Sequence, residues 1–291
     1  MWRKFHAGPQ ADGFSQRQTR HRLLSAFGVA LATIGCAPPG PKAPVAATEA
    51  MRERIAARLP LGLAVSFLRA GGKEGARVIL VHGTPGSATG WTDYLVNPPS
   101  HVEIVALDRP GFGQSEPEGA VTALAAQAAA VAALLPDDGR TVVLIGHSLG
   151  GPVVARVAAD HPQRISAVVF LAASLDPGLE TIHPMQRVGA WSPVRAMLPR
   201  AIRNANAELM ALKQELEVLA AALPDIRAKV IIMHGTRDDL VPVANVAYMQ
   251  GRLTGARCVR TVLLDGHNHF LPWNSADSVR HAIDMALDPT C

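Results

Sequence analysis

Short apolar segments alternate along the chain with longer segments of helical periodicity, from about Leu61 to the C-terminus. The apolar segments are nearly continuous runs of β-branched and aliphatic residues, as expected for strands that are covered on both faces. The predicted strands are Val78–Val81, Val102–Leu107, Val142–Ile145, Ala167–Leu171, Val230–Met233 and Val259–Leu264, and Leu61–Leu68 is a candidate antiparallel edge strand. The predicted helices are Thr122–Leu135, Ser148 to about Asp160, Val243–Leu253 and Ser275–Leu287. This pattern predicts an α/β fold with a mostly parallel, doubly wound sheet.

The alternation breaks once, between Asp176 and Asp225. Prolines interrupt helical sequence there, no strand pattern is present, and Ala205–Leu223 is amphipathic. Open α/β sheets bind ligands at the edge where their parallel strands end. We therefore predict one domain at 61–291 whose small helical cap, at about 176–225, is inserted after strand 6 and lies above that edge.

Composition and charge narrow the function classes. The 291 residues are 48% hydrophobic and 18% charged, which is typical of a globular protein. The formal net charge of +4 comes from residues 1–35, which hold five basic side chains and one acidic side chain. The rest of the chain is balanced, so no nucleic-acid partner is predicted. No cysteine or histidine spacing resembles a zinc site, so no metal is expected.

The N-terminal segment is typical of an export signal. Its basic start is followed by the apolar run Leu23–Ala37 of about 15 residues, which is short for a membrane span of roughly 20. Gly35-Cys36 lies near the end of the run, which resembles a bacterial lipoprotein signal and so implies lipidation of Cys36, membrane anchoring and a cell-envelope location. We thus expect a leader at 1–35 and a Pro/Ala-rich linker at 36–60. An ordinary secretory signal, an uncleaved anchor and a cytoplasmic protein remain alternatives.

Two further cysteines, Cys258 and Cys291, lie near the C-terminus. They could pair in an oxidising compartment, but their spacing does not require a disulfide.

The chemistry centres on Gly146-His147-Ser148-Leu149-Gly150, which follows a predicted strand and opens a predicted helix. A chain that turns sharply from strand to helix forces the residue between them into strained backbone geometry. Glycine at positions 146 and 150 relieves the crowding, and the hydroxyl of Ser148 projects above the sheet. Ser148 is therefore the candidate nucleophile.

A serine hydroxyl needs a base within hydrogen-bond reach, and the base needs a carboxylate that orients it. Two histidines follow the last predicted strand, His267 and His269. The carboxylate candidates are Asp238 and Asp239 in the turn after the strand Val230–Met233, and Asp176 after an earlier strand.

Five motifs in order resemble the serine hydrolases of the α/β-hydrolase superfamily. They are His82-Gly83-Thr84-Pro85-Gly86, the turn Asp108–Ser115, the serine motif, the turn Gly235–Pro242 and His269-Phe270. The resemblance spans about 61–287. It implies that Ser148 is the nucleophile, His269 the base and Asp238 the acid, and that the backbone N–H groups of Thr84 and Leu149 form the oxyanion hole. It assigns a structural role to His82 and packing to His147.

The same resemblance implies hydrolysis of a small carboxylic ester through an acyl-enzyme, with no cofactor, and an apolar acyl or lipid-derived ester is favoured. Serine at position 148 argues against haloalkane dehalogenases and epoxide hydrolases, which use aspartate there. The alternatives are a thioesterase, an amidase, a perhydrolase, a C–C hydrolase, or a non-catalytic envelope lipoprotein that serves as a scaffold.

Two sets of cap residues bear on specificity. Apolar side chains either line an acyl pocket or hold the cap in place: Met185, Trp191, Met197, Leu198, Leu209, Met210 and Leu212. Four arginines either contact an anionic substrate or lipid head group, or form a solvated helix surface: Arg187, Arg195, Arg200 and Arg203.

Overall fold

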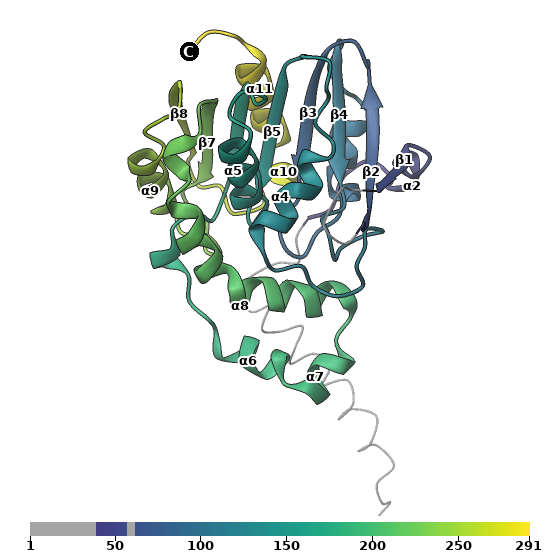
Figure 1. The fold of residues 1–291 in the computed structure, drawn as a ribbon, viewed down its shortest axis with the longest axis vertical. Coiled ribbons are helices and arrows are strands. Elements are labelled where there is room, and N and C mark those ends of the chain that lie inside the picture. Colours follow the sequence, from purple (N-terminus) through teal and green to yellow (C-terminus); the bar gives the residue numbers. More distant parts are fainter. Residues whose placement is uncertain (1–38, 57–61) are drawn as a thin grey trace, which may run out of the picture. The chain divides into compact units, whose positions relative to one another are not determined.

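The computed structural model describes residues 39–56 and 62–291. The leader 1–35 and Cys36 lie outside these residues. Eight strands form one sheet in the order β1-β2-β4-β3-β5-β6-β7-β8 (Figure 1). Only the β1–β2 and β2–β4 pairs are antiparallel. The strands are β1 Arg52–Ala56, β2 Ala64–Gly71, β3 Ala76–Val81, β4 Val102–Leu107, β5 Val142–His147, β6 Ala167–Leu171, β7 Lys229–Gly235 and β8 Cys258–Leu264.

Helices cover both faces of the sheet. Helices α4 (Leu124–Ala132), α5 (Gly150–Asp160) and α9 (Asn245–Arg252) pack on one face, and α3 (Thr92–Leu95) and α11 (Ala276–Leu287) pack on the other. Successive β3 residues enter opposite cores, which explains the continuous apolar run in the sequence. The shorter elements are α2 Ala46–Glu49, η1 Ala88–Trp91, η2 Pro177–Leu179, η3 Leu223–Asp225 and α10 Leu271–Asn274.

The predicted parallel strands and their flanking helices are confirmed, but the antiparallel edge differs. The predicted edge strand is β2, which is antiparallel, yet it lies inside the sheet because β1 pairs with its outer side. Helix α2 and strand β1 lie within 46–56, where the sequence suggests only a linker. Strand β1 has the sequence RERIA, and edge strands commonly carry such exposed charges, so no apolar run marks it.

Between β6 and β7, the chain forms α6 (Pro184–Ala190), α7 (Ser192–Met197) and α8 (Arg200–Ala220). Helix α8 begins before the predicted amphipathic segment, and its apolar residues Leu212, Leu216 and Leu219 join one core of the sheet. In Figure 1, α8 lies between the sheet and the pair α6 and α7. Within the described residues, no helix is both long and apolar enough to cross a membrane.

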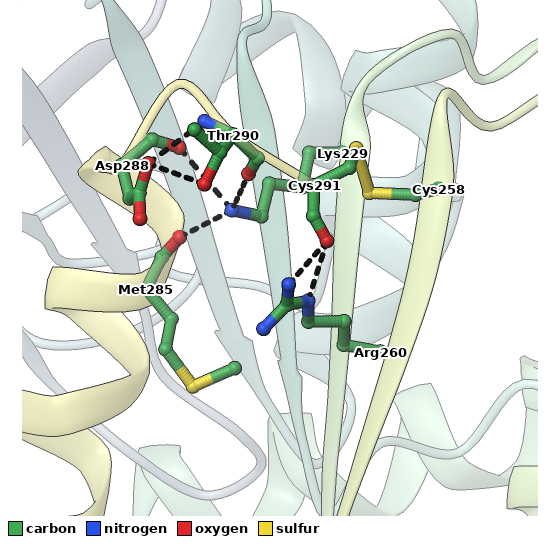
Figure 2. The surroundings of a disulfide bond; sticks show 7 residues. All are labelled: Lys229, Cys258, Arg260, Met285, Asp288, Thr290 and Cys291. Atoms are coloured by element: carbon green, nitrogen blue, oxygen red, sulfur yellow. Dashed lines mark hydrogen bonds between the residues drawn. A yellow bond between two sulfur atoms is a disulfide. The ribbon is translucent and has the colours of Figure 1, made fainter.

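A disulfide joins Cys258, at the start of β8, to the C-terminal Cys291 (Figure 2). The buried ammonium of Lys229 also holds the chain end, because it donates to the carbonyls of Met285 at 2.6 Å and Asp288 at 3.2 Å. Arg260 donates to the carbonyl of Cys291. These contacts fix the chain end at the edge of the sheet where β7 and β8 begin.

Candidate active site

Ser148 stands in the sharp turn between β5 and α5. Its φ is +54°, a left-handed conformation that non-glycine residues rarely adopt. A Cβ on Gly146 would lie 2.4 Å from the carbonyl oxygen of Gly150, and a Cβ on Gly150 would lie 2.3 Å from the carbonyl oxygen of Val81. The Ser148 N–H donates to the Leu171 carbonyl at 3.0 Å. The turn therefore needs glycine at both positions, and it leaves the serine side chain half-buried.

The predicted base and acid meet in a buried hydrogen bond. Nδ1 of His269, in the loop after β8, lies 2.8 Å from Oδ2 of Asp238, in the turn after β7. The other carboxylate oxygen, Oδ1, accepts the N–H groups of Leu240 at 3.0 Å and Val241 at 2.8 Å. The carboxylate is thus fixed by its own turn while it holds the imidazole.

His147 places the His269 loop beside the nucleophile. Its Nε2 lies 3.0 Å from the carbonyl oxygen of His269, and the two ring centroids are 4.8 Å apart. Because His147 immediately precedes Ser148, this bond ties the base loop to the serine turn. Burial, followed by the charge of His269, lowers the pKa of His147 to about 3, so its ring is neutral and donates Nε2–H to the carbonyl.

Asp238 is ionised despite its burial. Burial alone would raise its pKa, but hydrogen bonds from His234, His269 and the Val241 backbone lower the pKa far below the usual aspartate value. A carboxylate can only accept, so Nδ1 of His269 carries a proton. In the neutral imidazole, Nε2 is then unprotonated and can accept a proton from a serine hydroxyl.

His234, near the end of β7, is a second histidine beside Asp238, and it belongs to none of the five motifs. Its side chain is fully buried, with Nε2 2.9 Å from the Val241 carbonyl oxygen and 3.3 Å from Oδ2 of Asp238. A carbonyl oxygen can only accept, so Nε2 of His234 carries the proton. This N–H points toward the Val241 carbonyl oxygen and Oδ2 of Asp238. A histidine at the end of a buried strand, four residues before the candidate acid, was the available signal.

The loop after β3 lies against the nucleophile. A Cβ on Gly83 would lie 2.8 Å from Cβ of Ser148 and 3.3 Å from its Oγ, so only glycine allows this approach. Thr84 follows Gly83, and Leu149 follows Ser148 at the start of α5. The two predicted oxyanion-hole donors therefore belong to the two segments that meet at the serine.

Glu208 connects α8 to this loop, a contact that sequence spacing could not predict. Its buried carboxylate pairs with the buried Arg109 in two hydrogen bonds, of 2.7 and 3.0 Å. Oε2 also accepts the Thr84 hydroxyl at 2.6 Å. Arg109 in turn donates to the carbonyls of His82 and Gly83, each at 2.9 Å. The turn Asp108–Ser115, one of the five motifs, thus supports the loop that carries Thr84.

The alternative site residues have other partners. Nδ1 of His267 lies 2.6 Å from the Ser275 hydroxyl. Asp239 is exposed, and Asp176 accepts the Gly178 N–H at 2.8 Å as the cap of η2. Among the hydrogen bonds of the described residues, none joins these three side chains to His269. The described part of the chain also holds no cluster of three His, Cys, Asp or Glu residues that could bind a metal.

Two of the apolar cap residues differ from both interpretations of the sequence. Trp191 is 65% exposed and Met197 is 83% exposed, so they neither line a closed pocket nor hold the cap on the sheet. Leu212 is buried in the core, as the packing interpretation requires. Of the four cap arginines, Arg200 and Arg203 pair with a glutamate of the loop before α4, Glu118.

A protein-family model described as the alpha/beta hydrolase fold matches residues 76–196, from β3 through the serine turn to α7. The chain has the α/β-hydrolase fold. Among curated proteins, the dihydrolipoyllysine-residue acetyltransferase component of the acetoin cleaving system of Cupriavidus necator is 39% identical over 113 residues. That match covers 38% of this chain and 30% of the relative, so the chain aligns with less than a third of that protein.

Several solved structures resemble most of the chain. A membrane phospholipase A, described as a bacterial virulence factor, is 20% identical with a TM-score of 0.61 and covers 94% of this chain and 100% of its own. The Paleococcus ferrophilus monoacylglycerol lipase is 19% identical with a TM-score of 0.64, covering 78% and 99%. A putative aryl esterase from Burkholderia cenocepacia is 22% identical with a TM-score of 0.62, covering 81% and 99%. At these identities the likeness concerns the fold.

Proposed function

We propose that this chain is a serine hydrolase that cleaves carboxylic esters through an acyl-enzyme. The observation that carries the proposal is the buried hydrogen bond between His269 and the ionised Asp238, in a loop that His147 ties to the turn of Ser148. The match to the α/β-hydrolase model supports a hydrolase in general. The proposal adds to this a serine nucleophile and an ester bond.

In the first half of the reaction, Oγ of Ser148 attacks the ester carbonyl while Nε2 of His269 takes the hydroxyl proton. The charge that develops on the carbonyl oxygen is stabilised by the N–H groups of Thr84 and Leu149. Asp238 stabilises the imidazolium that forms. When the tetrahedral intermediate collapses, the bond to the alcohol oxygen breaks and His269 returns its proton to the departing alcohol.

In the second half, His269 takes a proton from water, and the hydroxide attacks the acyl group on Ser148. Collapse of this second intermediate releases the carboxylic acid and restores the serine hydroxyl. Residues of the chain perform every proton transfer, so the proposal needs neither a metal nor a cofactor.

An ester with an apolar acyl chain, or one derived from a lipid, is the proposed substrate class. The likeness to a phospholipase and a monoacylglycerol lipase supports this choice. We also propose export to the cell envelope, as the leader and Cys36 predict. The Cys258–Cys291 disulfide supports that location, because disulfides persist in oxidising compartments.

The test is a panel of p-nitrophenyl esters of increasing acyl length, with matched thioesters and anilides. We expect esters to turn over fastest, and Ser148→Ala and His269→Ala each to lower kcat at least ~10³-fold. His267→Ala is the matched control and should keep most activity, because His267 contacts Ser275 instead of Asp238. Preference for thioesters or amides would replace the ester assignment. Full activity of Ser148→Ala would overturn the mechanism.

A further inference from the structure

The pair α6 and α7 lies on the side of α8 that is turned away from the sheet (Figure 1). Gly189 of α6 is buried, and a Cβ there would lie 3.3 Å from Nδ2 of Asn206 on α8. The same Asn206 donates to the carbonyl of Gln186 at 2.9 Å. These contacts place Gly189 on the side of α6 that α8 covers.

The segment Ile182–Met197 exposes several large apolar side chains. Trp191 and Met197 are the two most exposed large apolar side chains in the described part of the chain, at 65% and 83%. Val188 and Ile182, each 41% exposed, lie in the same segment. Large apolar side chains that cluster on a surface mark a site of association with a protein or a membrane.

The charges of this segment have one sign. From Thr181 to Ala207 the sequence contains four arginines and no aspartate or glutamate. Two of these arginines pair with Glu118, whereas Arg187 and Arg195 are exposed and form no ion pair with any residue that the structure describes. We define the α6–α7 surface as the exposed side chains of Ile182, Arg187, Val188, Trp191, Arg195 and Met197.

We propose that the α6–α7 surface docks on an anionic lipid membrane. A tryptophan ring partitions to the boundary between head groups and acyl chains, and arginine can bury its methylenes while its guanidinium stays at the phosphates. The head groups of anionic lipids form a continuous negative surface. This surface complements the guanidinium groups of Arg187 and Arg195, which have no acidic partner among the described residues. Helices of 7 and 6 residues cannot span a bilayer, so they would lie within its interface.

Docking here would deliver a lipid-derived ester close to the candidate site. Helix α8 separates the α6–α7 surface from the sheet, and its Glu208 holds Thr84 of the loop beside Ser148. The inference rests on the proposed function only where it assigns the docking a purpose, the delivery of this ester. The docking itself needs no active serine, so Ser148→Ala should bind membranes as the wild type does.

The first test measures co-sedimentation of the full chain with vesicles of diether phosphatidylcholine, alone or mixed equally with diether phosphatidylglycerol. Ether-linked chains offer no carboxylic ester to cleave, so binding is read without the proposed turnover. Arg187→Gln/Arg195→Gln should weaken binding to the anionic vesicles roughly 25-fold, about fivefold for each arginine, and change binding to the neutral ones little. Trp191→Ser/Met197→Ser should weaken binding to both by at least ~10-fold. Arg227→Gln and Val218→Ser, matched exposed residues elsewhere, should bind like the wild type.

The second test reads insertion at one site, and it holds even where the N-terminal segment contributes to binding. Brominated lipids quench a tryptophan that enters the membrane, and wild type minus Trp191→Phe isolates Trp191. We expect this difference to be strongly quenched on anionic vesicles. No quenching of Trp191 in the vesicle-bound protein would overturn the proposal. So would self-association that the same substitutions abolish, without lipid binding, since the occupant would then be a second copy of the chain.

The two proposals fail separately. Membrane docking that persists while Ser148→Ala retains full ester turnover would overturn only the catalytic assignment. Ester hydrolysis that depends on Ser148, without any effect of the α6–α7 substitutions on vesicle binding or quenching, would overturn only the docking assignment.

Discussion

At the scale of single residues, the candidate site depends on hydrogen-bond donors and acceptors that hold the base and the acid in place near the Ser148 hydroxyl. Asp238 is held by two N–H groups of its own turn, so its remaining oxygen can orient His269. The left-handed backbone of Ser148 is strained by an amount on the order of 1–3 kcal/mol, and close packing between neighbouring segments maintains it. The glycines at positions 146 and 150 permit that packing.

Replacing Asp238 by asparagine tests the role of its charge. We expect kcat on a p-nitrophenyl ester to fall about 10⁴-fold with little change in KM, because an amide no longer favours the tautomer with a proton on Nδ1 of His269. Asp239→Asn and Asp176→Asn are the controls and should have mild effects, since neither carboxylate contacts His269. An equal loss in Asp239→Asn would contradict the assignment of the acid.

The sequence predicted Ser148, His269 and Asp238 because each lies in a short motif after a strand. His234 carried a signal as well, because it ends a buried strand four residues before Asp238. The contacts of Glu208 with Arg109 and Thr84 carried none, because they join segments about 100 residues or more apart in sequence, which only the fold brings together. No local pattern carries such contacts.

At the scale of secondary-structure elements, α8 and the loop after β3 act as one unit. Glu208, Arg109 and Thr84 form a buried network in which every connection crosses between elements. Gln127 of α4 adds a fourth donor to the same carboxylate, at 3.0 Å. A buried carboxylate with this many donors fixes the position of α8 relative to the loop that carries the candidate oxyanion N–H.

Glu208→Gln tests whether this network positions the oxyanion loop. We expect kcat to fall by an order of magnitude or more with KM nearly unchanged, because an oxyanion hole acts mainly on the transition state. Unfolding free energy should also fall, by roughly 3–5 kcal/mol, since Arg109 remains buried without its charge partner. Glu215→Gln on the same helix is the control. A loss of stability in Glu208→Gln without any loss of kcat in the folded enzyme would show that the network only supports the fold.

Strands and helices that bury a face were predictable, because burial leaves a periodic apolar pattern. The six parallel strands were found in this way. Strand β1 was not, since three of its five residues are charged and its stability comes from pairing with β2. For Trp191 and Met197 the sequence left an acyl pocket and packing as alternatives, and it did not indicate exposure, because a sequence cannot show which side of a short helix is covered.

At the scale of the whole molecule, the chemistry and the chain terminus occupy opposite edges of the sheet. Ser148, Asp238 and His269 follow the ends of β5, β7 and β8, whereas the disulfide lies where β8 begins. The disulfide closes a loop of 33 residues at that far edge.

Breaking the disulfide should therefore affect stability and leave catalysis unchanged. We expect Cys258→Ser/Cys291→Ser to lower the unfolding free energy by roughly 2–4 kcal/mol without changing kcat at a temperature where the variant is folded. Thermal unfolding with and without dithiothreitol measures the effect. The double variant is the control, and its unfolding temperature should be the same with and without the reductant. A large fall in kcat would indicate that the two edges of the sheet are coupled.

Acid should destabilise the fold through two buried histidines. Burial, then the charge of a neighbour (Arg109 for His82, His269 for His147), lowers the pKa of both below the usual value near 6.5. As the pH falls, these histidines are therefore protonated in the unfolded chain before they are protonated in the folded protein. The free energy of unfolding falls as the pH drops below about 6.5, by ~1.4 kcal/mol per pH unit for each histidine. The lowered pKa of Asp238 adds a loss only below about pH 4.

Urea unfolding at pH 7 and pH 5 measures this dependence. Over that interval we expect a loss of about 4 kcal/mol in the wild type and about half of it in His147→Gln, which removes one of the two titrating rings. An identical pH dependence in His147→Gln and the wild type would contradict the account of His147.

The central claim is that Ser148 is an activated nucleophile, and covalent labelling tests it most directly. The folded wild type is treated with a fluorophosphonate, and the adduct is located by peptide mass spectrometry. We predict one adduct, on Ser148, which is absent in Ser148→Ala and forms far more slowly in His269→Ala. A folded wild type that stays unlabelled, or carries its adduct on another residue, would contradict the claim and favour a non-catalytic role for this fold.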